Sequence, residues 1–148
     1  MPGSPRALSG PIARTDDVRR CASYRRTAVG SARVARRTGT YRHTVDIRSH
    51  HVSVDEPLEA GGEDTAPSPQ EMLAASLASC TAVTMEMYAE RKGWDLGYVE
   101  VECSYTPAER GCPTRFDLVL RLPEDASDEQ VERLKIIAAK CPIHRTLD

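Results

Sequence analysis

The stretch after Pro67 contains one long helix together with its start and stop signals. Ser68 suits the N-cap, a proline suits the first helical position, and Glu71 completes a capping box. Gly93 favours the left-handed backbone that ends helices, so we expect the helix to run to about Lys92. Its large apolar residues alternate with alanine, serine and threonine, and charges are rare until its last third. A helix this apolar requires cover on most sides, from a sheet or from a second chain.

Two hairpins are expected around this helix. Residues 40–47 and 51–54 alternate apolar and polar side chains on either side of a short turn, and residues 99–105 and 116–122 do the same across a longer connection. The segment 57–67 is rich in glycine, proline and acids, which predicts a loop long enough to cover a site.

A second helix begins at Ser127, where Gln130 completes another capping-box pattern, and its apolar stripe ends at Cys141 and Pro142. The order is two strands, helix, two strands, helix, without an internal repeat. With 148 residues, the chain has the length of one domain. We therefore expect an α+β domain.

The charge is distributed unevenly. Residues 1–40 carry nine arginines, no lysine and two aspartates, whereas residues 41–148 carry eleven basic and twenty acidic residues. We expect 1–38 to be a basic, disordered extension or the product of an upstream start codon, and 39–148 to be the folded domain. A transit peptide and an arm for an anionic surface remain alternatives.

Composition also restricts the setting. Five cysteines is an odd number, no signal-peptide hydrophobic region opens the chain, and no apolar run is long enough to span a membrane. We therefore expect reduced thiols in the cytoplasm and no membrane partner. The acidic main part of the chain argues against nucleic acid, which requires a basic surface.

Two cysteines stand apart from the others. Cys80 lies three residues after Leu77 and seven after Leu73, so we expect it to face the interior of the protein. Cys141 follows the apolar stripe of the second helix in the same way. If it ends that helix, the helix dipole disfavours its thiolate; if it caps a short helix begun by Pro142, the dipole favours it. Paired redox thiols suit this arrangement, and structural thiols in the core are the alternative.

Other chemistry finds little support. Cys141 and His144 have half of a zinc-like spacing, to which His50, His51 and Cys80 would be distant additions. No glycine-rich phosphate loop and no serine-hydrolase elbow occur. The remaining cysteines need no function, since they lie on the apolar face of a strand, in a turn and in the basic extension: Cys103, Cys112 and Cys21.

Three segments carry a family resemblance. They are residues 66–82 (APSPQEMLAASLASCTA), 91–94 (RKGW) and 140–147 (KCPIHRTL). In this order and with these two cysteines, the chain from residue 39 onward resembles the OsmC/Ohr family, which comprises osmotically inducible protein C and the organic hydroperoxide resistance proteins. Family chains usually continue with one more strand where this sequence stops.

The resemblance implies an OsmC-like fold: antiparallel sheets wrapped around long central helices of an intertwined homodimer, with two active sites at the subunit interface. It implies that Cys80 attacks the O–O bond of a hydroperoxide and becomes a sulfenic acid. Cys141 would then resolve it as a disulfide, which a cellular dithiol reduces. No metal or flavin cofactor is implied.

The same resemblance provides further candidates. Family peroxidases pair the thiolate with an arginine from the early strands, for which Arg48 is the first candidate and Arg42 the second. They also have a glutamate where this chain has Gln70. Glu71, one residue on, can substitute for it or serve the capping box alone. His144 adds a possible base and tuning group beside the second cysteine.

The sequence therefore predicts a thiol peroxidase that reduces organic hydroperoxides in oxidative or osmotic stress. One alternative is an OsmC-like protein that handles persulfides or other sulfur species. Another is a non-catalytic stress protein that binds an apolar ligand at the dimer interface. The motifs are closer to the OsmC-like branch than to the organic hydroperoxide reductases.

Overall fold

The computed structural model describes residues 32–37 and 39–147, with the backbone alone for residues 35–37. Three strands form one antiparallel sheet in the order β1-β2-β3: β1 (Ala32–Arg37), β2 (His43–Ile47) and β3 (His50–Val54). The expected hairpin is β2–β3, paired from His43 opposite Val54 to Ile47 opposite His50. Arg48 begins its two-residue turn with a positive φ of 56°, a conformation that non-glycine residues seldom adopt.

Strand β1 corrects the expected start of the ordered domain. The sequence suggested order from Gly39 onward, yet β1 pairs with β2 from Ala32 opposite Ile47 to Arg37 opposite His43. Arginine-rich edge strands lack a clear apolar alternation, which is why the pattern was missed. The rest of the predicted basic extension, residues 1–31 and 38, lies outside the described residues, and its disorder stays a prediction.

The loop before the long helix is held by Asp55, which is buried. Its carboxylate accepts hydrogen bonds from the hydroxyl of Thr65 at 2.7 Å and from the backbone N–H of Glu56 at 2.9 Å. These bonds, led by that of Thr65, lower the pKa of Asp55. Gly62 allows the tight path, because a Cβ there would lie 1.8 Å from the carbonyl oxygen of Glu56. One 3-10 turn, η2 (Leu58–Ala60), lies within the loop.

The long helix α1 (Pro69–Lys92) has the predicted ends. The Ser68 hydroxyl accepts from the Glu71 N–H, the Glu71 carboxylate accepts from the Ser68 N–H, and Gly93 ends the helix in the left-handed conformation. Helix α2 (Asp128–Ala138) likewise begins with the capping box of Ser127. Both helix predictions are confirmed.

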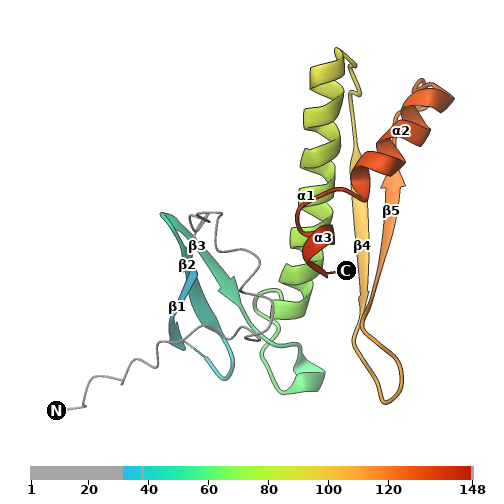
Figure 1. Ribbon diagram of the computed structural model, residues 1–148. Coiled ribbons are helices and arrows are strands. Elements are labelled where there is room, and N and C mark those ends of the chain that lie inside the picture. The colour runs from blue at the N-terminus through green and yellow to red at the C-terminus, as the bar shows by residue number, and fades with distance from the viewer. Residues whose placement is uncertain (1–31, 38, 148) are drawn as a thin grey trace, which may run out of the picture. The chain divides into compact units, whose positions relative to one another are not determined.

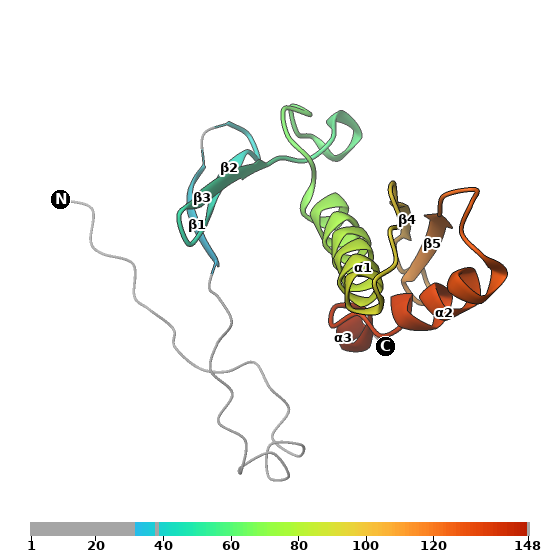
Figure 2. The same ribbon diagram turned by 90° about the horizontal axis from the view of Figure 1, so that it is seen from above.

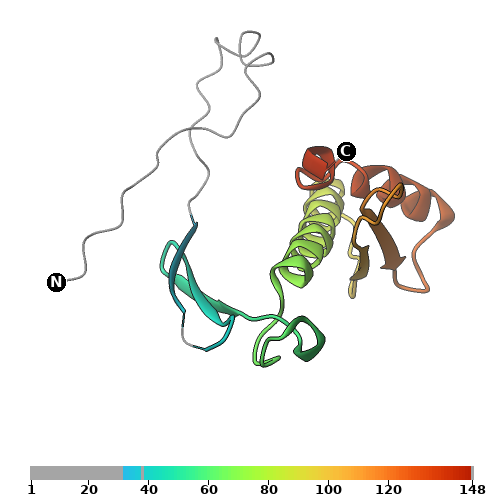
Figure 3. The same cartoon turned by 90° about the horizontal axis from the view of Figure 1, so that it is seen from below.

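The second hairpin joins β4 (Glu100–Thr106) to β5 (Arg115–Arg121), also as predicted. Helix α1 packs against β4 and against α2, as Figure 1 shows. The core lies among these elements, with Met85, Ala89, Leu96, Leu134 and Ala138 buried together. A last short helix, α3 (His144–Leu147), lies beside α1, as both Figure 2 and Figure 3 show.

Candidate active site

The turn after α2 decides between the two settings predicted for Cys141. Helix α2 ends at Ala138, and the carbonyl of Cys141 accepts the first backbone hydrogen bond of the next turn, from Arg145 at 3.1 Å. The sulfur of Cys141 accepts the N–H of His144 at 3.2 Å. This is the position of a helix cap, with sulfur in place of the usual oxygen. Cys141 therefore caps the short helix α3 and does not end α2.

Cys141 is fully buried, with 0% of its surface exposed, as expected. Two donors lie near its sulfur: the N–H of His144 at 3.2 Å and the hydroxyl of Thr81 at 3.6 Å. Burial by itself raises the pKa of this thiol, but the hydrogen bonds from His144, Thr81 and Cys80 outweigh it, so that the pKa of Cys141 lies below its usual value.

Cys80 lies on the edge of the buried face of α1, not within it. The buried face runs through Ala74, Leu77, Thr81, Met85 and Ala89. Cys80 is half-buried. The expectation that Cys80 faces the interior is thus wrong in part, because the stripe through Leu73 that suggested it is itself exposed.

Cys80 opens into a shallow groove of about 380 Å³. The groove contains no charged side chain and is lined by Ser76, Ser79, Cys80, Val83, Thr84, Met87 and Pro142. Pro142, which follows Cys141 directly, lines the same groove as the half-buried Cys80, whereas Cys141 itself has no exposed surface. This arrangement allows a small apolar molecule to reach Cys80 but not Cys141.

Thr81 is the site residue that sequence reasoning missed. It is fully buried and its hydroxyl contacts both the carbonyl of Leu77, at 2.8 Å, and the sulfur of Cys141. The signal was present: Thr81 lies four residues from both Leu77 and Met85, so it shares their buried face. A buried hydroxyl there requires a polar partner.

The other predicted site residues lie elsewhere in the described chain. Arg48 is exposed on the β2–β3 turn and contacts the ring of His50 at 3.3 Å. Glu71 is engaged in the capping box, and the two hydrogen bonds from Ser68 lower its pKa. Glu71 is nine residues before Cys80, which corresponds to the opposite side of the helix. His144 acts on the buried thiol through its backbone N–H.

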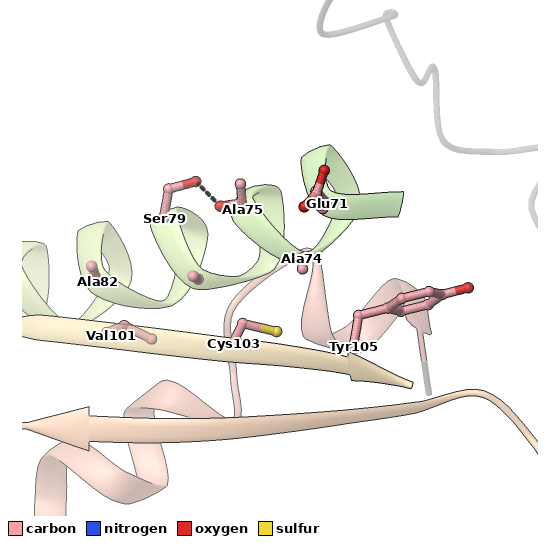
Figure 4. A pocket seen from close by; sticks show the side chains of 9 residues that line it. Glu71, Ala74, Ala75, Ser79, Ala82, Val101, Cys103 and Tyr105 are labelled. Carbon is pink, nitrogen blue, oxygen red and sulfur yellow. Dashed lines mark hydrogen bonds between the residues drawn. The ribbon is translucent and has the colours of Figure 1, made fainter. Parts of the chain in front are cut away.

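A larger groove of about 610 Å³ lies between α1 and β4. Figure 4 shows its two walls, with Glu71 and Ser79 on the helix and Val101, Cys103 and Tyr105 on the strand. Most of the helix side is alanine. Burial and the nearby Asp117 raise the pKa of the Cys103 thiol, so this third cysteine is kept neutral.

No zinc ligand set was found in the part of the chain that the structure describes. Within residues 32–37 and 39–147, no group of three histidine, cysteine, aspartate or glutamate side chains is placed to hold a metal ion. Of the helices that the structure describes, none combines the length and the apolar character of a membrane span.

Comparison with known proteins decides the family. The family model for OsmC-like proteins matches residues 61–148, which include both site cysteines. This chain belongs to the OsmC-like family. A search of the curated proteins finds no match.

Solved structures confirm the fold of this OsmC-like protein. A protein assigned to the osmotic stress and detoxification response of Psychrobacter arcticus 273-4 is similar with a TM-score of 0.69 and 19% identity, over 85% of this chain and 92% of that one. The organic hydroperoxide resistance protein OsmC of Legionella pneumophila is similar with a TM-score of 0.62 and 19% identity, over 80% of this chain and 88% of that one. An organic hydroperoxide resistance protein from Elizabethkingia anophelis, with thiocyanate bound, is similar with a TM-score of 0.64 and 17% identity, over 83% of this chain and 90% of that one. The α+β fold with antiparallel sheets is thereby confirmed.

Proposed function

We propose that this protein is a thiol peroxidase that reduces organic hydroperoxides. Family membership supports a stress-related redox role. The observation that carries the proposal is that the half-buried thiol of Cys80 lines a groove with Pro142, the neighbour of the buried Cys141, while Thr81, the residue after Cys80, contacts the Cys141 sulfur. In this proposal the first thiol is the one that a substrate reaches, and the second forms a disulfide with it.

The chemistry uses both thiols and no cofactor. Cys80, as thiolate, attacks the outer oxygen of the hydroperoxide, an alcohol leaves, and Cys80 becomes a sulfenic acid. Cys141 then attacks the Cys80 sulfur, water leaves and a disulfide forms. A cellular dithiol reduces this disulfide and completes the cycle. The uncharged groove in front of Cys80 suits an alkyl group better than a charged one.

We also propose that the active form is a homodimer. Exposed apolar side chains follow one face of α1, where Val83 is 50% and Met87 56% exposed. Together with Leu73, Ser76 and Cys80, these residues are spaced by three and four, as on a helix that packs against another helix. In the described chain Arg48 has no recorded contact with a sulfur, so its predicted role requires a second subunit. The proposed role of Glu71, in place of the family glutamate at Gln70, likewise requires a second subunit.

Steady-state turnover of an alkyl hydroperoxide with a dithiol tests the peroxidase. We expect Cys80→Ser to abolish turnover, and Cys141→Ser to stop after one oxidation, at the sulfenic acid. Cys103→Ser is the matched control, since it removes another half-buried thiol of the same chain. Full turnover by Cys80→Ser contradicts the proposal. Turnover of persulfides but not of hydroperoxides would support the alternative function, the handling of sulfur species.

The groove between α1 and β4 favours a second function, the binding of an apolar ligand. Its volume of about 610 Å³ is within the range of small-molecule sites, and alanines form much of its wall. A fluorescent fatty acid tests this function. Binding that survives Cys80→Ser but is lost in Ala78→Trp, which fills the groove, supports it. Absence of binding to the wild-type protein excludes it.

A further inference from the structure

A groove of about 440 Å³ between the end of α1 and one face of α2 has no part in the peroxidase chemistry. Its volume is within the range of small-molecule sites. The groove combines two aromatic rings with side chains of both charges and is lined by Tyr88, Lys92, Trp94, Glu129, Glu132, Arg133 and Ile136. Tyr88 lies eight residues after Cys80, which is about 12 Å along the helix. This groove is therefore separate from the one beside Cys80.

Two half-buried aromatic rings supply the apolar part of the groove. The rings of Tyr88 and Trp94 meet edge to face, with their centroids 5.7 Å apart, and both pack against the buried core cluster. Because the core supports them, the two rings present a firm surface to a ligand. Ile136, 49% exposed on α2, extends this surface. An aromatic ring is the ligand body that suits such a surface best.

Two cations converge on the Tyr88 side chain. The Arg133 Nε–H donates to the Tyr88 hydroxyl at 3.0 Å, and the Lys92 ammonium lies 5.8 Å from the centre of the Tyr88 ring. Among the residues that the structure describes, neither cation is paired with a carboxylate, although three other arginines are. The bond through Nε leaves the two terminal nitrogens of Arg133, the fork that fits a carboxylate, without a recorded protein partner. Since Tyr88 already holds this arginine, it loses little further freedom when an anion binds.

The carboxylates of the groove limit the charge of the ligand. Glu132 is paired with Lys135 at 2.6 Å, so its charge is compensated. Glu129 also lines the groove and has no recorded ion pair within residues 32–37 and 39–147. One uncompensated carboxylate against two cations leaves a single positive charge, which a monoanion matches and a dianion exceeds.

We propose that this groove binds a small aromatic carboxylate as a monoanion. The ring of the ligand lies against Tyr88 and Trp94. Its carboxylate accepts hydrogen bonds from the terminal nitrogens of Arg133 and is attracted by the charge of Lys92. This site is additional to the proposed peroxidase function and requires no cysteine.

Trp94 is the only tryptophan of the chain, so its fluorescence reports directly on the groove. The test is a titration of the wild-type full chain with benzoate as the probe. We expect a saturable change in fluorescence. Benzamide, the uncharged counterpart of benzoate, is expected to bind about tenfold more weakly or less, because it cannot form charge-assisted hydrogen bonds.

Four variants assign the binding to the groove. Arg133→Gln is expected to weaken benzoate binding by about 10- to 100-fold, and Lys92→Gln to weaken it as well. Glu129→Gln is expected to tighten it, since a like charge is removed. Arg110→Gln is the matched control, because it removes an exposed arginine from the connection between β4 and β5, and it should change nothing.

Isothermal titration calorimetry with the same probes provides a readout that does not depend on the tryptophan. Equal affinities for benzoate and benzamide, or for benzoate in wild type and Arg133→Gln, overturn the inference. Absence of both heat and a fluorescence change overturns it as well. Tighter binding of phenyl phosphate, a dianion at about pH 8, overturns the assignment of a monoanion. Cys80→Ser is expected to bind benzoate like wild type, so the result stands apart from that of the peroxidase assay; loss of binding in this variant contradicts a separate site.

Discussion

Replacement of Thr81 by valine removes one donor from the Cys141 sulfur and keeps the shape of the side chain. The hydroxyl has one proton, shared between the Leu77 carbonyl at 2.8 Å and the sulfur at 3.6 Å. A hydrogen bond to a charged group stabilises by about 1.5–3 kcal/mol and one between neutral groups by about 0.5–1.5 kcal/mol. When Cys141 is ionised, the Thr81 proton leaves the neutral Leu77 carbonyl for the charged sulfur. The difference between the two hydrogen bonds is about 1 kcal/mol, or roughly fivefold in the thiol–thiolate equilibrium of Cys141.

The expected result is a higher pKa of Cys141 in Thr81→Val and a smaller thiolate fraction at neutral pH, measured by ultraviolet titration of the reduced protein. Thr84→Val is the matched control. Its hydroxyl also bonds to a helix carbonyl, that of Cys80 at 2.7 Å, and it has no recorded contact with Cys141. An unchanged titration in a folded Thr81→Val protein would refute the assignment of Thr81 as a donor.

Three further predictions concern packing and pH. Leu134→Ala, in the fully buried core, is expected to lower the free energy of unfolding by about 2–5 kcal/mol, and Ile136→Ala, 49% exposed on the same helix, by far less, both measured in urea. Met87→Asp is expected to turn dimers into monomers in sedimentation equilibrium without loss of helix; dimers that persist contradict the proposed interface. The lowered pKa of Cys141 stabilises the reduced fold above the ordinary thiol pKa of about 8.5, and this contribution is lost as the pH falls through the lowered value. The difference in melting temperature between wild type and Cys141→Ala should therefore grow with pH across that window, and a constant difference contradicts it.

Local chemistry made the two main helices predictable. Ser68 and Ser127 each occupy a capping box, and Gly93 ends α1 in the left-handed conformation that glycine adopts most readily. These capping signals involve residues only three or four positions apart, so the sequence alone is sufficient to predict where the helices begin and end. The two hairpins were equally predictable, because successive residues of a strand point to opposite faces and apolar and polar side chains therefore alternate in the sequence.

Tertiary packing supplied what the sequence could not. The orientation of α1 depends on which apolar stripe β4 and α2 cover, and Leu73 and Leu77 look equivalent until that choice is known. The role of Thr81 depends on Cys141, which is sixty residues away in the chain. The setting of Cys141 depended on whether α2 continued as far as this residue or ended before it, and the hydrogen bond from the His144 N–H to the Cys141 sulfur has no local sequence signal.

The most direct test is the mass of the reduced protein before and after one equivalent of an alkyl hydroperoxide, followed by peptide mapping. The account predicts rapid loss of two hydrogen atoms and a linkage between Cys80 and Cys141. An unchanged mass on the seconds timescale, or a disulfide that involves Cys103 or Cys112 instead, would contradict it.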